Sequence, residues 1–312
     1  MSAFDRAGVE SLRDVRVIER PLPAGPRGDL WFLGFGVSKY RDPALNLDFA
    51  EKDAKDLAAA FARARGVGFT DVHVATYVDD QVTVARLREA KAFFASAKVD
   101  DVAVVFVAGH GTHSRDAAAD YFFVTHDVDV RRLRDTAAPF ALVEGLLDGI
   151  QPRRKLLFLD TCESGERDVD WAPAAATAGQ KARTTRALVL AAAGTGSTPL
   201  SPPRARARPW LLARDRLIDH DLSRRSGALV FAASRGDELS WEDDSLQNGV
   251  FTSALRAALE TSAADADRDG QVSLDELRAF VTRTVAARTG DKQHPSVDHD
   301  NLALRVAWPT VR

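Results

Sequence analysis

The sequence predicts an α/β fold in which a mainly parallel sheet of about six strands lies between two layers of helices. Two observations carry this prediction. Apolar runs alternate with segments of helical spacing along most of the 312-residue chain, which is typical of strand–helix–strand units. The apolar runs also lack a regularly spaced polar face, which indicates strands buried on both sides. In such sheets, functional residues lie in the loops beyond the carboxyl ends of the strands.

The first half of the chain contains four predicted strands and three predicted helices. Residues 30–37 (LWFLGFGV) form a continuous apolar run that ends in turn residues, and 72–78, 101–108 (DVAVVFVA) and 155–160 (KLLFLD) are similar runs. Between them, residues 45–63, 83–97 and 140–150 repeat apolar residues at helical spacing. The inward face of the first helix is expected to hold Leu47, Ala50, Ala54, Leu57, Ala58 and Phe61.

The pattern breaks after residue 165 and resumes at residue 227. Residues 195–209 hold four prolines and three arginines, which excludes a regular helix or a central strand there. A fifth strand at 228–233 and a helix at 250–259 follow. We therefore divide the chain into an N-terminal extension (1–28), a first α/β portion (29–165), a linker (166–226) and a second portion (227–312).

Composition excludes several classes of protein. The 42 Lys and Arg against 45 Asp and Glu give a formal charge of −3, so the net charge gives no reason to expect nucleic acid or an anionic membrane as a partner. The single cysteine, Cys162, excludes an intramolecular disulfide and a Cys-rich zinc fold. The longest apolar runs have seven residues, against the roughly 20 that span a bilayer, and residues 1–17 lack a signal-peptide core. We expect a cytoplasmic protein.

Two predicted strands run directly into residues that carry chemistry. The third strand ends in 109–111 (GHG) and the fourth in 160–165 (DTCESG), and loops at neighbouring strand ends would place the thiol of Cys162 beside His110. A free thiol has a pKa of about 8.5, and a nearby imidazole increases its thiolate character. A glycine next to the histidine keeps the loop open, and the amides of Gly111 and Cys162 could together stabilise an oxyanion.

A structural interpretation of the same residues stands beside this one. A free cysteine is usually a small buried apolar residue, and a single histidine is usually a packed polar group. His113 and His126 are the other candidates for a catalytic base. Neither of them ends a strand between two glycines, so we expect both to be loop or surface residues.

With these motifs the chain resembles the caspase and metacaspase peptidases in their bacterial form. The resemblance rests on FVAGHG (106–111) and RKLLFLDTCESG (154–165), with His110 and Cys162 separated by 52 residues, near the ~50 of caspases. It extends over LNLDFAEKDAKDL (45–57), ALVFAASRGDELSWE (228–242) and NGVFTSAL (248–255). It covers nearly the whole chain from residue 30, but neither the first 28 residues nor most of the linker.

The resemblance implies a caspase–haemoglobinase fold with three α/β/α layers and the activity of a cysteine endopeptidase. Residues 29–165 correspond to the large-subunit portion and 227–312 to the small-subunit portion. Cys162 would be the nucleophile, His110 the general base and acid, and the amides of Gly111 and Cys162 the oxyanion donors. No third carboxylate that orients the histidine is implied. Metacaspases generally act as monomers, so we expect a monomer rather than a homodimer.

The residues that match the caspase P1 pocket are acidic in this chain. Animal caspases have glutamine where this chain has Asp160, and serine-tryptophan-arginine where it has Ser240, Trp241 and Glu242. Asp53 matches an acidic residue of the metacaspase pocket. Carboxylates attract a cation and repel Asp, so we expect cleavage after Arg or Lys, with Arg favoured because of its bidentate fork.

The individual pocket residues have distinct expected roles and alternatives. Trp241 would form an apolar wall of the neighbouring subsite, and the Ser240 backbone would pair with an extended substrate. The alternative for Asp53 is an ordinary exposed helix carboxylate. The alternative for Glu242 is a solvated turn, because Asp243 and Asp244 follow it.

A calcium-binding motif is present independently of this resemblance. Residues 265–276 (DADRDGQVSLDE) fit the EF-hand loop D-x-D-x-D-G-x5-E, and helical patterns precede and follow them. Gly270 would make the sharp turn. The expected Ca²⁺ ligands are Asp265, Asp267, Asp269, the Gln271 carbonyl, Ser273 and Glu276. Since EF-hands usually work in pairs and only one is visible, the role could be structural. The alternative is an Asp-rich loop that caps the second helix without metal.

The charge distribution predicts how activity is controlled. Residues 181–225 carry ten Lys or Arg against three Asp, a net +7, whereas residues 235–278 carry a net −7. A long, basic, proline-interrupted linker favours exposure and proteolysis. We therefore expect a form of low activity until the linker is cut, either by the protein itself or by an upstream protease.

Three other functions are alternatives to the peptidase. A catalytically silent caspase-like module could act as a Ca²⁺-responsive binding protein, but the intact Cys162 and His110 pair argues against it. A nucleic-acid binder could use the basic part of the linker, residues 181–225, but the only aromatic residue there is Trp210. A nucleotide-binding domain is excluded because neither G-x-G-x-x-G nor a Walker sequence follows the first strand. We expect protein substrates with exposed Arg or Lys sites, and neither nucleic acid nor membrane as a partner.

Overall fold

The structure is a computed structural model that describes residues 28–113, 120–161, 227–235, 238–297 and 306–309. The linker 166–226, the N-terminal extension up to residue 27 and Cys162 lie outside the described residues.

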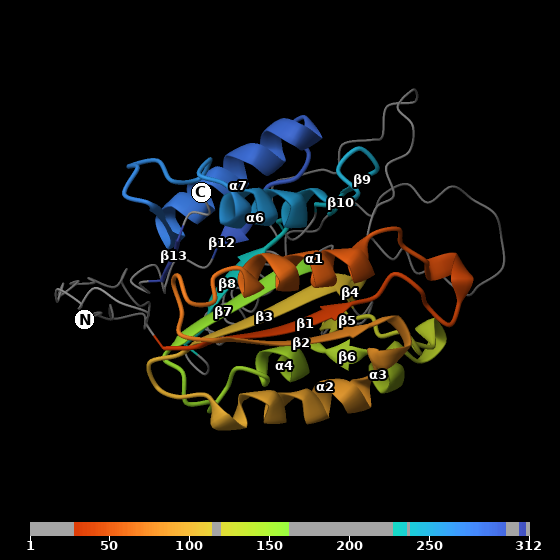
Figure 1. The fold of residues 1–312 in the computed structure, drawn as a ribbon. Coiled ribbons are helices and arrows are strands. Elements are labelled where there is room, and N and C mark those ends of the chain that lie inside the picture. The colour runs from red at the N-terminus through yellow and green to blue at the C-terminus, as the bar shows by residue number, and fades with distance from the viewer. Residues whose placement is uncertain (1–27, 114–119, 162–226, 236–237, 298–305, 310–312) are drawn as a thin grey trace, which may run out of the picture.

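A six-stranded sheet forms the centre of the molecule (Figure 1). Its order is β12-β8-β7-β3-β1-β2; five strands run parallel, and β12, at one edge, runs antiparallel to β8. The strands are β1 (Leu30–Gly36), β2 (Val72–Val78), β3 (Val102–Gly109), β7 (Arg154–Thr161), β8 (Leu229–Ala232) and β12 (Ser296–Val297). The five strands predicted from apolar runs are confirmed to within one residue at each end. β1, β3, β7 and β8 are buried along nearly their whole length. In the edge strand β2 only Val72 is buried, so the expectation of burial on both sides is wrong for that strand.

Helices cover both faces of this sheet, as the sequence predicts (Figure 1). On one side lie α1 (Ala50–Ala62), α6 (Val250–Glu260) and α7 (Leu274–Thr289). On the other side lie α2 (Val84–Ala90), α3 (Leu133–Thr136) and α4 (Phe140–Glu144). Phe61 of α1 illustrates the packing: its ring lies 5.3 Å from that of Phe32 in β1 and 6.4 Å from that of Phe158 in β7. The three-layer α/β/α architecture is therefore confirmed.

The helices are shorter than their apolar patterns predict. The predicted helix 45–63 begins only at Ala50, because a 3-10 turn (Pro43–Leu45) and extended backbone at Asn46 precede it. The predicted helix 83–97 is α-helical over Val84–Ala90 and continues as a 3-10 helix over Lys91–Ser96. The predicted helix 140–150 ends at Glu144 and continues as turns.

Three small sheets were not predicted. Strands of two or three residues are too short to show a periodicity. The first small sheet contains β4 (Gly111–His113), β5 (Tyr121–Phe123) and β6 (Ala138–Pro139), and the second β9 (Glu242–Asp243) and β10 (Asn248–Gly249). The third pairs β11 (Gln271–Ser273) with β13 (Ala307–Pro309). Within the described ranges, no helix combines the length and the apolar content needed to cross a membrane.

Candidate active site

The two chemistry-bearing loops begin at neighbouring strand ends. β3 pairs with β7 in parallel, and the last pair of the register joins Gly109 to Thr161. His110 follows Gly109 in the chain, and Cys162 follows Thr161. The expectation that these strand ends are neighbours is therefore confirmed, although Cys162 itself lies outside the described residues.

The side chain of His110 is buried and held in a defined orientation. It is 5% exposed, and its Nε2 lies 2.9 Å from the carbonyl oxygen of Leu45. A carbonyl only accepts hydrogen bonds, so Nε2 carries the hydrogen and Nδ1 carries the lone pair of the neutral ring. Nδ1 is thus the atom that can take a proton. His126 is engaged elsewhere, because its Nδ1 lies 2.6 Å from the carbonyl of Lys39.

Two supports of His110 were missed by the sequence analysis. The first is the Leu45 carbonyl, which orients the ring as a carboxylate would in other catalytic sites. The second is Tyr40, which is 4% exposed and whose hydroxyl accepts a 2.9 Å hydrogen bond from the His110 backbone N–H. The rings of Tyr40 and His110 also pack at a centroid distance of 5.3 Å. A backbone carbonyl leaves no signature in residue type, so no sequence pattern marks the role of Leu45.

The glycines on either side of His110 serve different purposes. Gly109 adopts a φ of +148°, and a Cβ there would lie 3.0 Å from the Tyr40 hydroxyl and 3.2 Å from the Phe123 ring. Tight packing therefore requires this glycine, whereas an open loop was expected. Gly111 lies in β4 opposite Phe123. Because Val124 N–H donates to the His110 carbonyl, the alternation of an antiparallel ladder directs the Gly111 N–H away from β5, as an oxyanion donor requires.

Asp160 connects the end of β7 to the second portion of the chain. The residue is fully buried, and its two carboxylate oxygens accept hydrogen bonds from the Ser240 hydroxyl at 2.8 Å and the Thr252 hydroxyl at 2.6 Å. The structure thus brings together Asp160 and Ser240, two of the predicted pocket residues. Ser240 contributes its side chain to this contact, which the sequence analysis did not predict.

The segment that contains Trp241 has a defined inner and outer side. Trp241 N–H donates to Gln293 Oε1 at 3.1 Å, and Trp241 C=O accepts from Val250 N–H at 2.9 Å. Both backbone groups of Trp241 therefore face inward. Because backbone groups of an extended strand alternate in direction, those of Ser240 and Glu242 are directed outward, which is the orientation that an added substrate strand needs.

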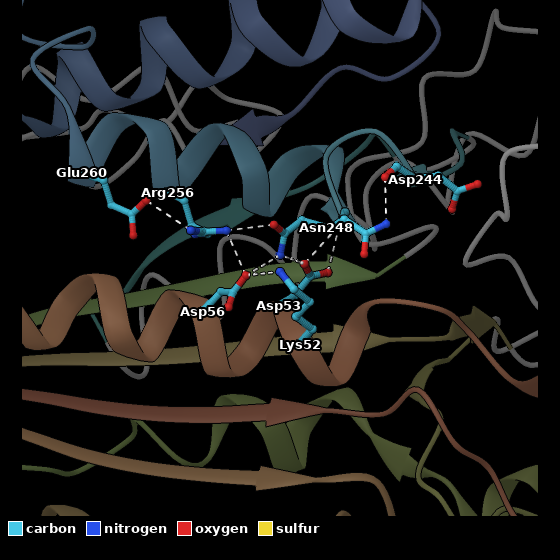
Figure 2. Close-up of polar contacts among 9 residues, drawn as sticks. Lys52, Asp53, Asp56, Asp244, Asn248, Arg256 and Glu260 are labelled. Atoms are coloured by element: carbon cyan, nitrogen blue, oxygen red, sulfur yellow. Dashed lines mark hydrogen bonds and ion pairs between the residues drawn. The ribbon is translucent and has the colours of Figure 1, made fainter.

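Asp53 (Figure 2) and Glu242 are both buried in the structural framework of this region. Asp53 is fully buried; it accepts the Asn248 side-chain amide at 2.8 Å and the Gly249 N–H at 3.0 and 3.1 Å. Glu242 is 2% exposed and accepts the N–H groups of Asp48 and Phe49, just before α1, both at 3.1 Å. The alternatives of an exposed helix carboxylate and a solvated turn are therefore wrong, and both residues join the first portion of the chain to the β9–β10 hairpin.

An ionic network extends this junction along α1 and α6 (Figure 2). Arg256 Nη1 lies 2.8 Å from Asp56 Oδ2 and 2.9 Å from the side-chain Oδ1 of Asn248, and Nη2 lies 3.2 Å from Glu260 Oε2. Burial alone would raise the pKa of Asp56, but hydrogen bonds from Lys52 and Asn248 and the charge of Arg256 outweigh it and lower the pKa. The carboxylate of Asp56 is thus held ionised between the two helices.

A cavity of about 780 Å³ lies beside the support of His110. Leu45 forms part of its wall, together with charged residues of both signs that include Arg41, Asp42, Arg131 and Asp135. The carbonyl that orients His110 therefore belongs to a residue that also faces this polar cavity.

The predicted calcium loop has the backbone of a compact acidic turn. Ligand atoms of Asp265, Asp267 and Asp269 lie within 4.8 Å of one another, and Gly270 adopts a φ of +84°. Both carboxylate oxygens of Glu276 reach back into the loop: one accepts the N–H groups of Ala266 and Asp267, and the other accepts the N–H and hydroxyl of Ser273. The short strand of the loop, β11, pairs with β13, so a strand of the same chain occupies the edge where a second EF-hand would pair.

Comparison with known proteins places this geometry in a family. The model of the caspase domain matches residues 32–306, whereas a search of curated proteins found no match. The crystal structure of a protein from Geobacter sulfurreducens (GSU0716) is similar, with a TM-score of 0.53 and 19% identity over 90% of this chain and 97% of that one. Caspase-1 from Spodoptera frugiperda is similar with a TM-score of 0.50 and 15% identity, over 91% and 94% of the two chains.

Identities this low establish the fold alone, but the family model spans most of the chain and includes both chemistry-bearing loops. The chain therefore belongs to the caspase domain family of cysteine peptidases.

Proposed function

We propose that this protein is a cysteine endopeptidase in which Cys162 is the nucleophile and His110 is the general base. The observation that carries this proposal is the orientation of His110. The Leu45 carbonyl accepts a hydrogen bond from its Nε2–H, which leaves Nδ1 as the basic atom. His110 directly follows the end of β3, where Gly109 pairs with Thr161, the residue before Cys162.

The proposed reaction follows from these groups. His110 Nδ1 takes the thiol proton of Cys162, and the sulfur attacks the scissile carbonyl carbon. The Gly111 and Cys162 amides stabilise the resulting oxyanion. Imidazolium then returns the proton to the leaving amine as the C–N bond breaks, and water hydrolyses the thioester to release the carboxylate and regenerate the thiol.

We further propose that the substrate residue before the scissile bond is Arg or Lys. Asp160 precedes Cys162 by two residues and contacts Ser240, so a carboxylate lies close to the expected substrate position. Asp53 and Glu242 add negative charge to the same junction of α1 with the β9–β10 hairpin. A desolvated carboxylate there favours a guanidinium and rejects Asp.

A positional panel of fluorogenic peptides tests this proposal. We expect hydrolysis after Arg, weaker hydrolysis after Lys and none after Asp, with no turnover by Cys162→Ala or His110→Ala. Hydrolysis after Asp but not Arg would contradict the pocket argument and leave the peptidase proposal intact. Absence of any turnover by the folded wild-type protein, both with its linker intact and with its linker cut, would favour the catalytically silent binding module.

We also propose that the linker 166–226 controls activity. It contains Arg183, Arg186, Arg204, Arg206 and Arg208. An Arg-specific enzyme could cut its own chain after these residues, or an upstream protease could cut the linker instead. Intact-mass analysis during incubation, with Cys162→Ala as the control, should show cleavage in the linker that coincides with a rise in activity. A chain that is fully active while uncut would refute the proposal that the linker controls activity.

Cytoplasmic location and a monomeric state stay predictions.

Finally, we propose that the loop 265–276 binds Ca²⁺. Three clustered aspartates, the turn at Gly270 and the position of Glu276 support this proposal, since Ca²⁺ prefers oxygen ligands in such a loop. When bound, the ion would neutralise the charge of this acidic loop. In Cys162→Ala protein, Ca²⁺ should raise the melting temperature, and in protein that also carries Asp267→Ala it should not. Equal responses to Ca²⁺ in both proteins would favour the metal-free capping loop.

A further inference from the structure

The turn after α7 meets the segment that is expected to bind substrate. α7 ends at Thr289, and Gly290 and Asp291 both adopt a φ of +62°, so the chain turns sharply back toward β8. The next residues, Lys292 and Gln293, bring this turn against the segment that contains Ser240 and Trp241.

Gln293 is the central residue of this contact. Its side chain is fully buried. Oε1 accepts the Trp241 N–H at 3.1 Å, while Nε2 donates to the Ala233 carbonyl at 2.8 Å and lies 3.5 Å from the Ser240 hydroxyl. One side-chain amide thus joins the end of β8 to the segment, and only a residue with both a donor and an acceptor at this reach can do so.

A second contact from the same turn holds the beginning of the segment. The His294 backbone N–H donates to Glu238 Oε2 at 2.6 Å, and His294 Nδ1 lies 2.8 Å from Glu238 Oε1. Glu238 is 5% exposed. The segment from Glu238 to Trp241 is therefore anchored at both ends by two consecutive residues of one turn.

We propose that Gln293 is a positioning residue that sets the register of the substrate-binding segment, residues 240–242. This inference rests on the proposed peptidase function. By holding the Trp241 N–H inward, Gln293 directs the backbone groups of Ser240 and Glu242 outward, where an extended substrate pairs with them. Loss of the amide leaves the Trp241 N–H without its acceptor, and the segment can then twist away from the orientation that substrate requires.

The expected kinetic signature is specific. Gln293→Met keeps the length of the side chain and removes both hydrogen bonds, so KM for an Arg peptide should rise roughly tenfold to a hundredfold while kcat stays within about twofold of wild type. Gln293→Glu keeps an acceptor for the Trp241 N–H but turns a carboxylate oxygen toward the Ala233 carbonyl, so that two acceptors face each other, and its KM should also rise above the wild-type value. The rate at which iodoacetamide alkylates Cys162 should stay unchanged in both, because that reaction uses Cys162 and His110 but not the segment.

Trp31→Phe is the matched control. It removes a buried hydrogen bond of 3.0 Å between Trp31 Nε1 and Asp101 at the opposite end of the sheet, so it should lower stability without changing KM. Concentrations of active enzyme are set by titration of Cys162, which removes the effect of misfolded protein. If Gln293→Met does not fold, Gln293→Glu decides.

The outcomes separate this inference from the proposed function. A wild-type KM in the folded Gln293 variants, or a rise in KM matched by Trp31→Phe, would overturn the positioning role alone. A parallel fall in the alkylation rate would mean that Gln293 acts on the fold of the whole site, and would also overturn it. A wild-type protein that hydrolyses no peptide even after its linker is cut would overturn the proposed function and this inference together.

Discussion

Substitution of Asp53 by Asn is expected to destabilise the protein strongly, even though it changes neither the size nor the shape of the side chain. The carboxylate is fully buried and accepts two donors of the β9–β10 hairpin, the Asn248 side-chain amide and the backbone N–H of Gly249 (Figure 2). Gly249 is the N-cap residue of α6. Asp53 therefore ties the first turn of α1 to the start of α6, between positions separated by 196 residues.

The magnitude follows from these hydrogen bonds. An Asn side chain keeps one acceptor oxygen but turns an NH2 group toward donors that are already buried. A hydrogen bond to a charged group contributes about 1.5–3 kcal/mol, and an unsatisfied buried donor costs about 1–3 kcal/mol. Since one of the two donors can keep a partner, we expect a loss of about 2–4 kcal/mol. At roughly 2–4 °C for each kcal/mol in a chain of this size, the melting temperature should fall by roughly 4–16 °C.

Urea and thermal unfolding measure this loss, in a Cys162→Ala background that prevents self-cleavage. Glu51→Gln is the matched control, because Glu51 lies in the same turn of α1 and forms a surface ion pair with Lys55, a contact that contributes little. The control should change stability by less than about 0.5 kcal/mol. If Asp53→Asn is as stable as the control, Asp53 does not hold the hairpin, and a role confined to the substrate pocket would be favoured.

Three further predictions concern the surroundings of His110 and His294. Tyr40→Phe removes the acceptor of the buried His110 N–H, so kcat on an Arg peptide should fall roughly tenfold to a hundredfold; an unchanged kcat would show that Tyr40 does not support the histidine. Gly109→Ala should lower unfolding stability by more than Gly66→Ala does, because both glycines have a positive φ but a Cβ meets the Tyr40 hydroxyl at 3.0 Å only at Gly109; equal losses in urea unfolding would refute the packing argument. Burial lowers the pKa of His294 and nearby Arg235 adds to this, but hydrogen bonds to Asp291 and Glu238 outweigh both, so the pKa is raised above its ordinary value of 6.5. The stabilisation from His294 is then complete below pH 6.5 and is lost as pH rises through the raised pKa, so the stability difference from His294→Asn should shrink with rising pH; a difference that grows would contradict this sign.

Most of the sheet could be predicted from sequence because β1, β3, β7 and β8 are buried on both faces. A strand such as β1 is apolar at nearly every position and stops where turn residues begin, so its ends can be located to within a residue. The adjacency of the loops at His110 and after Thr161 followed from the same fact, since the carboxyl ends of neighbouring parallel strands meet at one edge.

The contacts that complete the site could not be predicted in the same way. Leu45 acts through its backbone carbonyl, which every residue type possesses. Glu242 and Asp53 contact backbone N–H groups that lie 193 to 196 residues away in the chain, and no periodicity reports a pairing of that length. A buried carboxylate that stabilises a loop and an exposed one that binds a substrate cation have the same residue type, so only their surroundings distinguish them.

The most direct test of the central claim is covalent labelling of the nucleophile by an arginyl acyloxymethyl ketone, followed by intact-mass analysis and peptide mapping. The reagent resembles a substrate with Arg before the scissile bond and alkylates only a thiolate that is aligned with it. We expect one adduct for each chain, located on Cys162, formed much more slowly in His110→Ala and competed by an Arg peptide. Wild-type protein that stays unlabelled after its linker is cut, or a His110→Ala variant that is labelled as fast as wild type, would contradict the assignment of Cys162 and His110 as a catalytic pair.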